Sequence, residues 1–147
     1  MENYRQTIQI NRQLPEVLNA FTKNIPLWWS ESFEGNAENP GDRFTVRFGN
    51  AVFKTIRVQH PESPKQVLWH VEDSLIDFEE LNNKREWINT RILWETEPDE
   101  EGVKIHLTHF GLHPEQDCYQ ICAAGWQQFT GSLKQFLETG KGNPFLK

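Results

Sequence analysis

The chain has 147 residues, of which 37% are hydrophobic and 24% charged, a composition that excludes a disordered, collagenous or coiled-coil protein. Its formal net charge of −6 at pH 7 repels phosphate groups, so neither nucleic acid nor an anionic membrane surface is an expected partner. Its apolar runs are only a few residues long, so no membrane insertion is predicted.

The amino-terminal part of the chain is predicted to form one strand and two short helices. Residues 4–12 carry the spacing of a strand. A short helix is expected to open at Pro15, because proline fits in the first helical turn. A second helical turn is expected over residues 26–30, which include Trp28 and Trp29.

From Gly41 onward the apolar residues alternate with polar ones, which predicts antiparallel strands with one face buried. Short stretches that contain glycine, asparagine or proline separate these segments and are typical of turns. The strands are expected at residues 44–48, 52–59, 66–72, 87–97 and 103–112.

The last segment is predicted to be an amphipathic helix of about five turns. Apolar residues follow each other there at intervals of three or four: Tyr119, Cys122, Trp126, Phe129, Leu133, Phe136 and Leu137. Gly140 suits the left-handed residue that ends a helix, and Pro144 prevents the helix from resuming. A single long helix must bury its apolar stripe against a sheet, which therefore has to curl around it.

We therefore predict a single α+β domain over residues 1–147. It comprises a curved antiparallel sheet of about six or seven strands wrapped around the long carboxy-terminal helix. Two short helices are expected after the first strand.

Several short motifs, spread over nearly the whole chain, carry a resemblance to a known family: Leu27-Trp28-Trp29, Gly41-Asp42-Arg43-Phe44, Val67-Leu68-Trp69, Glu86-Trp87-Ile88-Asn89-Thr90, Leu107-Thr108-His109-Phe110-Gly111-Leu112, Gly125-Trp126 and Gly140-Lys141-Gly142-Asn143-Pro144. With this order of elements, the chain resembles the START-like, or SRPBCC, superfamily, which has a helix-grip fold. Within it the chain is most similar to the homologues of the activator of heat-shock protein 90 ATPase. That family contains chaperone activators, aromatic polyketide cyclases and lipid carriers.

The resemblance implies a ligand cavity where the helix diverges from the sheet. Aromatic side chains leave irregular walls that suit flat apolar molecules, so we predict non-enzymatic binding of a small hydrophobic or aromatic ligand, or a lipid, with no cofactor. The alternative is that the same rings fill a solid core. The residues predicted to line the cavity are Trp28, Trp29, Phe44, Val46, Trp69, Trp94, Leu107, His109, Cys122 and Trp126.

Other chemistry at these residues is less favoured by their spacing. His109, His113, Cys118 and Cys122 superficially resemble zinc ligands, but the cysteines lack the tighter spacing of a zinc knuckle, and no metal site is predicted. A nucleophilic Cys122 would need solvent access and a lowered pKa, neither of which is evident on the apolar stripe of a helix. No catalytic residue is predicted.

Two further functions follow from the resemblance alone. One is a protein-interaction module with a chaperone or another protein as partner, acting as a monomer or a homodimer. The other is a polyketide-cyclase-like enzyme, for which His109 and Tyr119 form the only polar pair expected inside the cavity. Cys118 and Cys122 lie one helical turn apart, which is poor geometry for a disulfide, and no signal peptide is evident; a cytoplasmic location is therefore expected.

Overall fold

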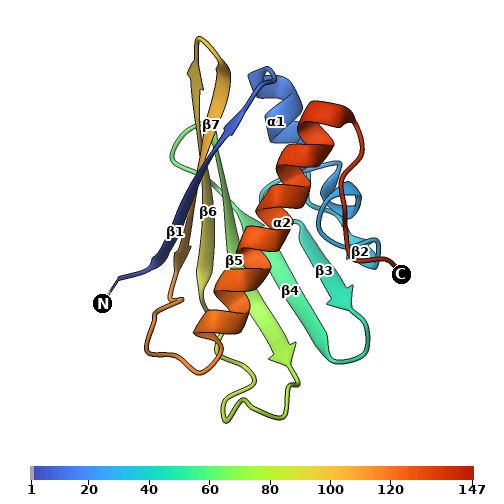
Figure 1. Cartoon of the computed structure of the whole chain (residues 1–147), viewed down its shortest axis with the longest axis vertical. Coiled ribbons are helices and arrows are strands. Elements are labelled where there is room, and N and C mark those ends of the chain that lie inside the picture. The colour runs from blue at the N-terminus through green and yellow to red at the C-terminus, as the bar shows by residue number, and fades with distance from the viewer. Residues whose placement is uncertain (1) are drawn as a thin grey trace.

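The computed structural model describes residues 2–147, and within them the strands form one antiparallel sheet of seven strands in the order β1-β7-β6-β5-β4-β3-β2 (Figure 1). In chain order the elements are β1 (Tyr4–Ile10), α1 (Leu14–Ala20), the 3-10 helix η1 (Ile25–Leu27), β2 (Phe33–Gly35), β3 (Arg43–Phe48), β4 (Val52–Gln59), β5 (Gln66–Ile76), β6 (Arg91–Asp99), β7 (Gly102–Phe110) and α2 (Tyr119–Thr139).

The long helix α2 crosses one face of the sheet, and its carboxy-terminal half lies beside α1 (Figure 1). Its buried side chains recur at intervals of up to four residues along one side of the helix: Cys122, Trp126, Thr130, Ser132, Leu133 and Leu137. The helix ends at Gly140, whose φ of 88° is left-handed and favours glycine. The predicted α+β helix-grip arrangement is therefore confirmed. Among the helices of residues 2–147, none is both long and apolar enough to cross a bilayer.

Several strands differ from the sequence prediction. The predicted bounds 4–12, 66–72 and 103–112 correspond to β1 ending at Ile10, β5 running on to Ile76 and β7 ending at Phe110. A strand is predicted from residue 87, but this is wrong, because β6 begins only at Arg91. Residues 86–89 form a turn, in which Asn89 has a left-handed φ of 67°. Trp87 is buried because its ring stacks on that of Trp126 in α2, at 5.7 Å, and not because it lies in the sheet. The three-residue edge strand β2 is too short for its alternation to be recognised.

A β-bulge decides which side chains of the second half of β5 face α2. The pairing between these strands shifts between Thr55 and Ile56, so Glu72 of β5 is an extra residue with no partner opposite it. Beyond the bulge, Ser74 is buried on the inner face and pairs with Lys54 of β4. The bulge therefore turns Ser74 onto the face that α2 covers, where it lies opposite Lys54.

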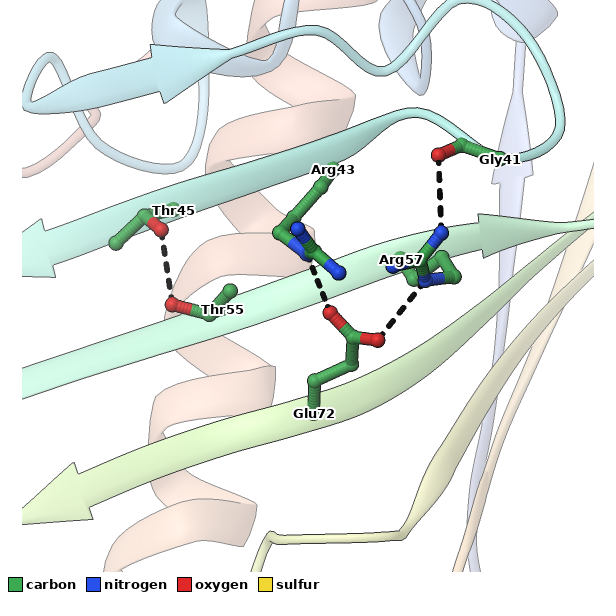
Figure 2. A network of polar contacts seen from close by, with 6 residues as sticks. All are labelled: Gly41, Arg43, Thr45, Thr55, Arg57 and Glu72. Atoms are coloured by element: carbon green, nitrogen blue, oxygen red, sulfur yellow. Dashed lines mark hydrogen bonds and ion pairs between the residues drawn. The ribbon is translucent and has the colours of Figure 1, made fainter.

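Glu72 itself forms an ion-pair network on the face of the sheet that points away from α2 (Figure 2). Its carboxylate accepts hydrogen bonds from the guanidinium groups of Arg43 and Arg57, the second over 2.9 Å. These hydrogen bonds, that of Arg43 first, lower the pKa of Glu72 to about 2. The network connects β3, β4 and β5 on their outer side.

Aromatic rings fill the interior between the sheet, α1 and the short helix η1. The ring of Phe21 stacks on that of Trp94 at 4.5 Å, and the rings of Trp69 and Trp94 meet edge to face at 5.7 Å. The indole N–H of Trp28 donates to the carbonyl of Ala20 over 2.7 Å. This part of the interior is a closely packed core.

Candidate functional site

A pocket of about 250 Å³ lies between the amino-terminal half of α2 and the inner face of β3, β4 and β5. Its wall is mostly aromatic and aliphatic. The helix contributes Ile121, Cys122, Gly125, Trp126, Gln128 and Phe129; the strands contribute Phe48, Val52, Lys54 and Ile76; and the connecting segments contribute Trp29, Phe78, Trp87 and Phe145.

Two local features keep this space open and bounded. No atom lies within 4 Å of the position that a Cβ of Gly125 would take, so this glycine leaves room that a larger residue would fill. Phe145 closes one side: its backbone N–H donates to the carbonyl of Trp29 over 3.0 Å, and its ring meets that of Phe48 at 5.7 Å. The segment that follows α2 is thereby held against the mouth of the pocket.

The residues predicted from the sequence to line a cavity divide into two groups. Trp29, Cys122 and Trp126 line the pocket. The others are buried in the packed core behind the pocket wall: Trp28, Phe44, Val46, Trp69, Trp94, Leu107 and His109. A direct contact of any of these ten residues with a ligand stays a prediction.

Lys54 is the one charged side chain among the pocket residues of the described chain, and it was not predicted as a site residue. It is 6% exposed, and its ammonium lies 4.3 Å from the ring centre of Trp87 and 5.3 Å from that of Phe48. Burial lowers the pKa of Lys54 to about 8. Alternation places Lys54 on the same face as Ile56 and Val58, and this spacing is the signal that could have identified it.

Two thiols lie beside this ammonium, and both cysteines are free. The indole N–H of Trp87 donates to the sulfur of Cys122 over 3.1 Å. A hydrogen bond from the Cys118 thiol, together with the positive charge of Lys54, lowers the pKa of Cys122. The same thiol–thiol hydrogen bond raises the pKa of Cys118. The indole N–H of Trp87 and the ammonium of Lys54 both favour the ionised form of Cys122.

His109 lies behind Trp126 and is fully engaged by protein groups. The Thr90 hydroxyl donates to the Trp87 carbonyl, so it accepts from Nε2 of His109 over 2.9 Å. The indole N–H of Trp126 donates to Nδ1 of His109 over 3.1 Å. Burial lowers the pKa of His109 to about 3, which keeps the ring neutral. His109 therefore orients Trp126 at the pocket wall and has no free nitrogen for a substrate.

The other polar residues considered in the sequence contact groups other than the ring of His109, which bonds to Thr90 and Trp126. The ring of Tyr119 packs edge-on against Tyr4 at 6.3 Å, and Nδ1 of His113 contacts the carbonyl of Glu2 over 3.1 Å. Within residues 2–147, no three His, Cys, Asp or Glu side chains lie close enough together to hold a metal ion.

Glu86, to which sequence reasoning assigns no role, supports the start of α2. Its carboxylate accepts the backbone N–H of Cys118 over 3.0 Å. The carboxylate of Asp117 in turn accepts the backbone N–H groups of Asn82 and Asn83. These bonds attach the segment between β5 and β6 to the beginning of the helix, and thereby position Trp87 over Lys54.

No protein-family model and no curated protein matches the sequence, whereas solved structures do match it. The Aha1 dimer from Colwellia psychrerythraea is 26% identical, with a TM-score of 0.79 over 97% of this chain and 100% of that one. DynU16, a protein in the dynemicin biosynthetic locus, is 20% identical, with a TM-score of 0.73 over 100% of this chain. This chain spans only 51% of DynU16.

A third match is CalU16 from Micromonospora echinospora, which is 18% identical, with a TM-score of 0.62 over 95% of this chain and 74% of that one. The curved sheet, the long carboxy-terminal helix and these matches define a START-like, or SRPBCC, helix-grip fold. Within that class the chain resembles the homologues of the activator of heat-shock protein 90 ATPase, as its motifs predict.

Proposed function

We propose that this chain binds a small aromatic molecule in the pocket between α2 and the inner face of β3, β4 and β5. The observation that carries the proposal is the aromatic wall of this pocket, to which Trp29, Trp87 and Trp126 all contribute. Its volume of about 250 Å³ lies near the lower end of ordinary ligand sites, which suits a ligand of about two fused rings. A long-chain lipid would need a longer cavity.

The two alternatives from the sequence have different support. A cyclase-like reaction has less, because both ring nitrogens of His109 are already bonded to Thr90 and Trp126. Self-association has more, because the similar protein from Colwellia psychrerythraea is a dimer. Sedimentation equilibrium would give the mass in solution. A chaperone partner and a cytoplasmic location stay predictions.

The test of ligand binding uses two matched glycines of α2. Gly125→Leu places a side chain in the pocket, whereas Gly131→Leu places one on the exposed side of the same helix. Both changes raise helix propensity by a similar amount, so a difference between them reports the pocket. Tryptophan fluorescence and native mass spectrometry with a panel of aromatic metabolites give the affinities.

We expect Gly125→Leu to weaken binding at least about tenfold, because a buried ligand and a leucine side chain cannot share the space. Gly131→Leu should bind as the wild-type protein does. Equal affinities for the two variants, or no binding of any aromatic compound by the wild-type protein, would contradict the proposal.

A further inference from the structure

Among the described residues, on the inner face of the sheet beside the pocket, one ammonium lacks an ion-pair partner and one hydroxyl lacks a hydrogen-bond partner, and in the packed core the indole N–H groups of Trp69 and Trp94 lack one as well. Within residues 2–147, the hydroxyl of Ser74 has no hydrogen-bond partner, and no carboxylate lies within ion-pair distance of the Lys54 ammonium. Ser74 is fully buried and Lys54 nearly so. Buried polar groups are ordinarily bonded, so this place in the core requires an explanation.

The two groups lie side by side. Lys54 and Ser74 are directly opposite in the pairing of β4 with β5, and residues opposite each other in a sheet project from the same face. An ammonium offers three N–H donors. The rings of Trp87 and Phe48 attract its charge but supply no lone pair of the strength of a carboxylate oxygen.

Two carboxylates that lie near Lys54 in the sheet form ion pairs with other basic side chains. Asp73, next to Ser74, pairs with Arg85 over 3.1 Å. Asp77, just beyond β5, pairs with Lys84 over 3.5 Å. The ammonium is therefore left facing the pocket, whose other described wall residues carry no acidic side chain.

Resting on the proposed function, we propose that Lys54 forms an anion subsite and that the ligand is an aromatic carboxylate. The ring of the ligand lies against Trp126 and Phe129, and the carboxylate of the ligand accepts hydrogen bonds from the Lys54 ammonium. A carboxylate would supply the counter-charge and the acceptors that the protein withholds. Burial lowers the pKa of Lys54 to about 8, which still lies above 7. The ammonium is therefore protonated at neutral pH.

The positive charge in the pocket favours this ligand over a neutral or cationic one. Besides Lys54, the only titratable group among the described wall residues is the thiol of Cys122. A cationic ligand would meet the ammonium with no acid to offset it. A neutral ring would fill the pocket but leave a buried charge unpaired.

The experiment compares two probes of nearly the same shape, 2-naphthoate and 2-naphthamide, by isothermal titration calorimetry at pH 7. A charge-assisted hydrogen bond predicts that the wild-type protein binds the carboxylate about tenfold to a hundredfold more tightly than the amide. Lys54→Met keeps an unbranched side chain that is shorter by one atom, removes the charge and should abolish this preference. Lys104→Met, on the exposed face of β7, should retain it.

The wild-type comparison does not depend on whether any variant folds. Equal affinity of the wild-type protein for the two probes would overturn the anion subsite and leave the aromatic pocket standing. A preference that survives in Lys54→Met, with its fold verified by circular dichroism, would also overturn it. If neither probe binds, this inference is overturned, whereas the proposed function is decided by the wider panel of aromatic metabolites.

Discussion

Lys54 lowers the free energy of unfolding of the ligand-free protein, because burial disfavours the charged form of its side chain. Its folded pKa of about 8 lies below its ordinary value of 10.5, so the unfolded chain binds the proton more tightly. The resulting destabilisation is fully present below pH 8 and disappears as the pH rises towards 10.5. We expect Lys54→Met to be more stable than the wild-type protein at pH 7, by up to about 3 kcal/mol.

Urea unfolding of both proteins at pH 7 and pH 10.5 measures this difference. The advantage of the variant should shrink at the higher pH. The thiols of Cys118 and Cys122 and the ring of His109 lie near Lys54 and couple to its charge, so the pH dependence is read as the difference between the two proteins. A variant that is less stable at pH 7 would show that the ammonium already has a partner in the free protein.

Lys54 also shows what strand spacing reveals about a single residue. Its inward direction follows from alternation with Ile56 and Val58. Its unpaired state does not follow, because that depends on Arg85 and Lys84 engaging the nearby carboxylates. In the same way, the inward position of His109 could be predicted, but its bonds to Thr90 and Trp126 needed the structure.

At the scale of the strands, the ion pairs of Glu72 predict how the stability of the protein changes in acid. The pKa of Glu72 is lowered to about 2 by its hydrogen bonds to Arg43 and Arg57, so the folded state holds its carboxylate ionised. The stabilisation is present above the ordinary value of 4.5 and is lost as the pH falls towards 2. Because the network is partly exposed, we expect Glu72→Gln to cost only about 1 kcal/mol at pH 7.

Unfolding measurements at pH 7 and pH 2.5 give the change in free energy for the wild-type protein and for Glu72→Gln. The two curves should converge at the lower pH. Glu95→Gln, on the outer side of β6, serves as a control because its carboxylate has only the side-chain amide of Gln66 as a partner. A constant difference for Glu72→Gln at all pH values would mean that the residue acts through the bulge geometry and not through its charge.

The elements differ in how far they could be predicted. The apolar stripe of α2 is long, and its end at Gly140 has a clear local signal, so the helix followed from spacing alone. The start of β6 could not be predicted in this way, because Trp87 is buried by its contact with α2 and does not lie in the sheet. The bulge at Glu72 has no signal in composition, since it arises from the pairing of two whole strands.

For the whole molecule, the architecture was predictable and the position of the pocket was not. A single long helix against an alternating sheet has few packing solutions. The open space depends on where the rings stop filling the interior: Trp69 and Trp94 pack closely, whereas Gly125 on the same helix as Trp126 leaves a gap. Alternation places all these residues inside and does not distinguish a packed ring from a lining one.

Binding in an interior pocket should stabilise the entire fold, since unfolding destroys the site. At a 2-naphthoate concentration of about 100 times its dissociation constant, linkage predicts an increase of about 2.7 kcal/mol in the free energy of unfolding. Urea titrations with and without the probe measure it. Gly131→Leu should show the same increase, and Gly125→Leu at most about 1.4 kcal/mol, because its affinity is at least about tenfold lower. An equal increase in both variants would place the binding site elsewhere on the protein.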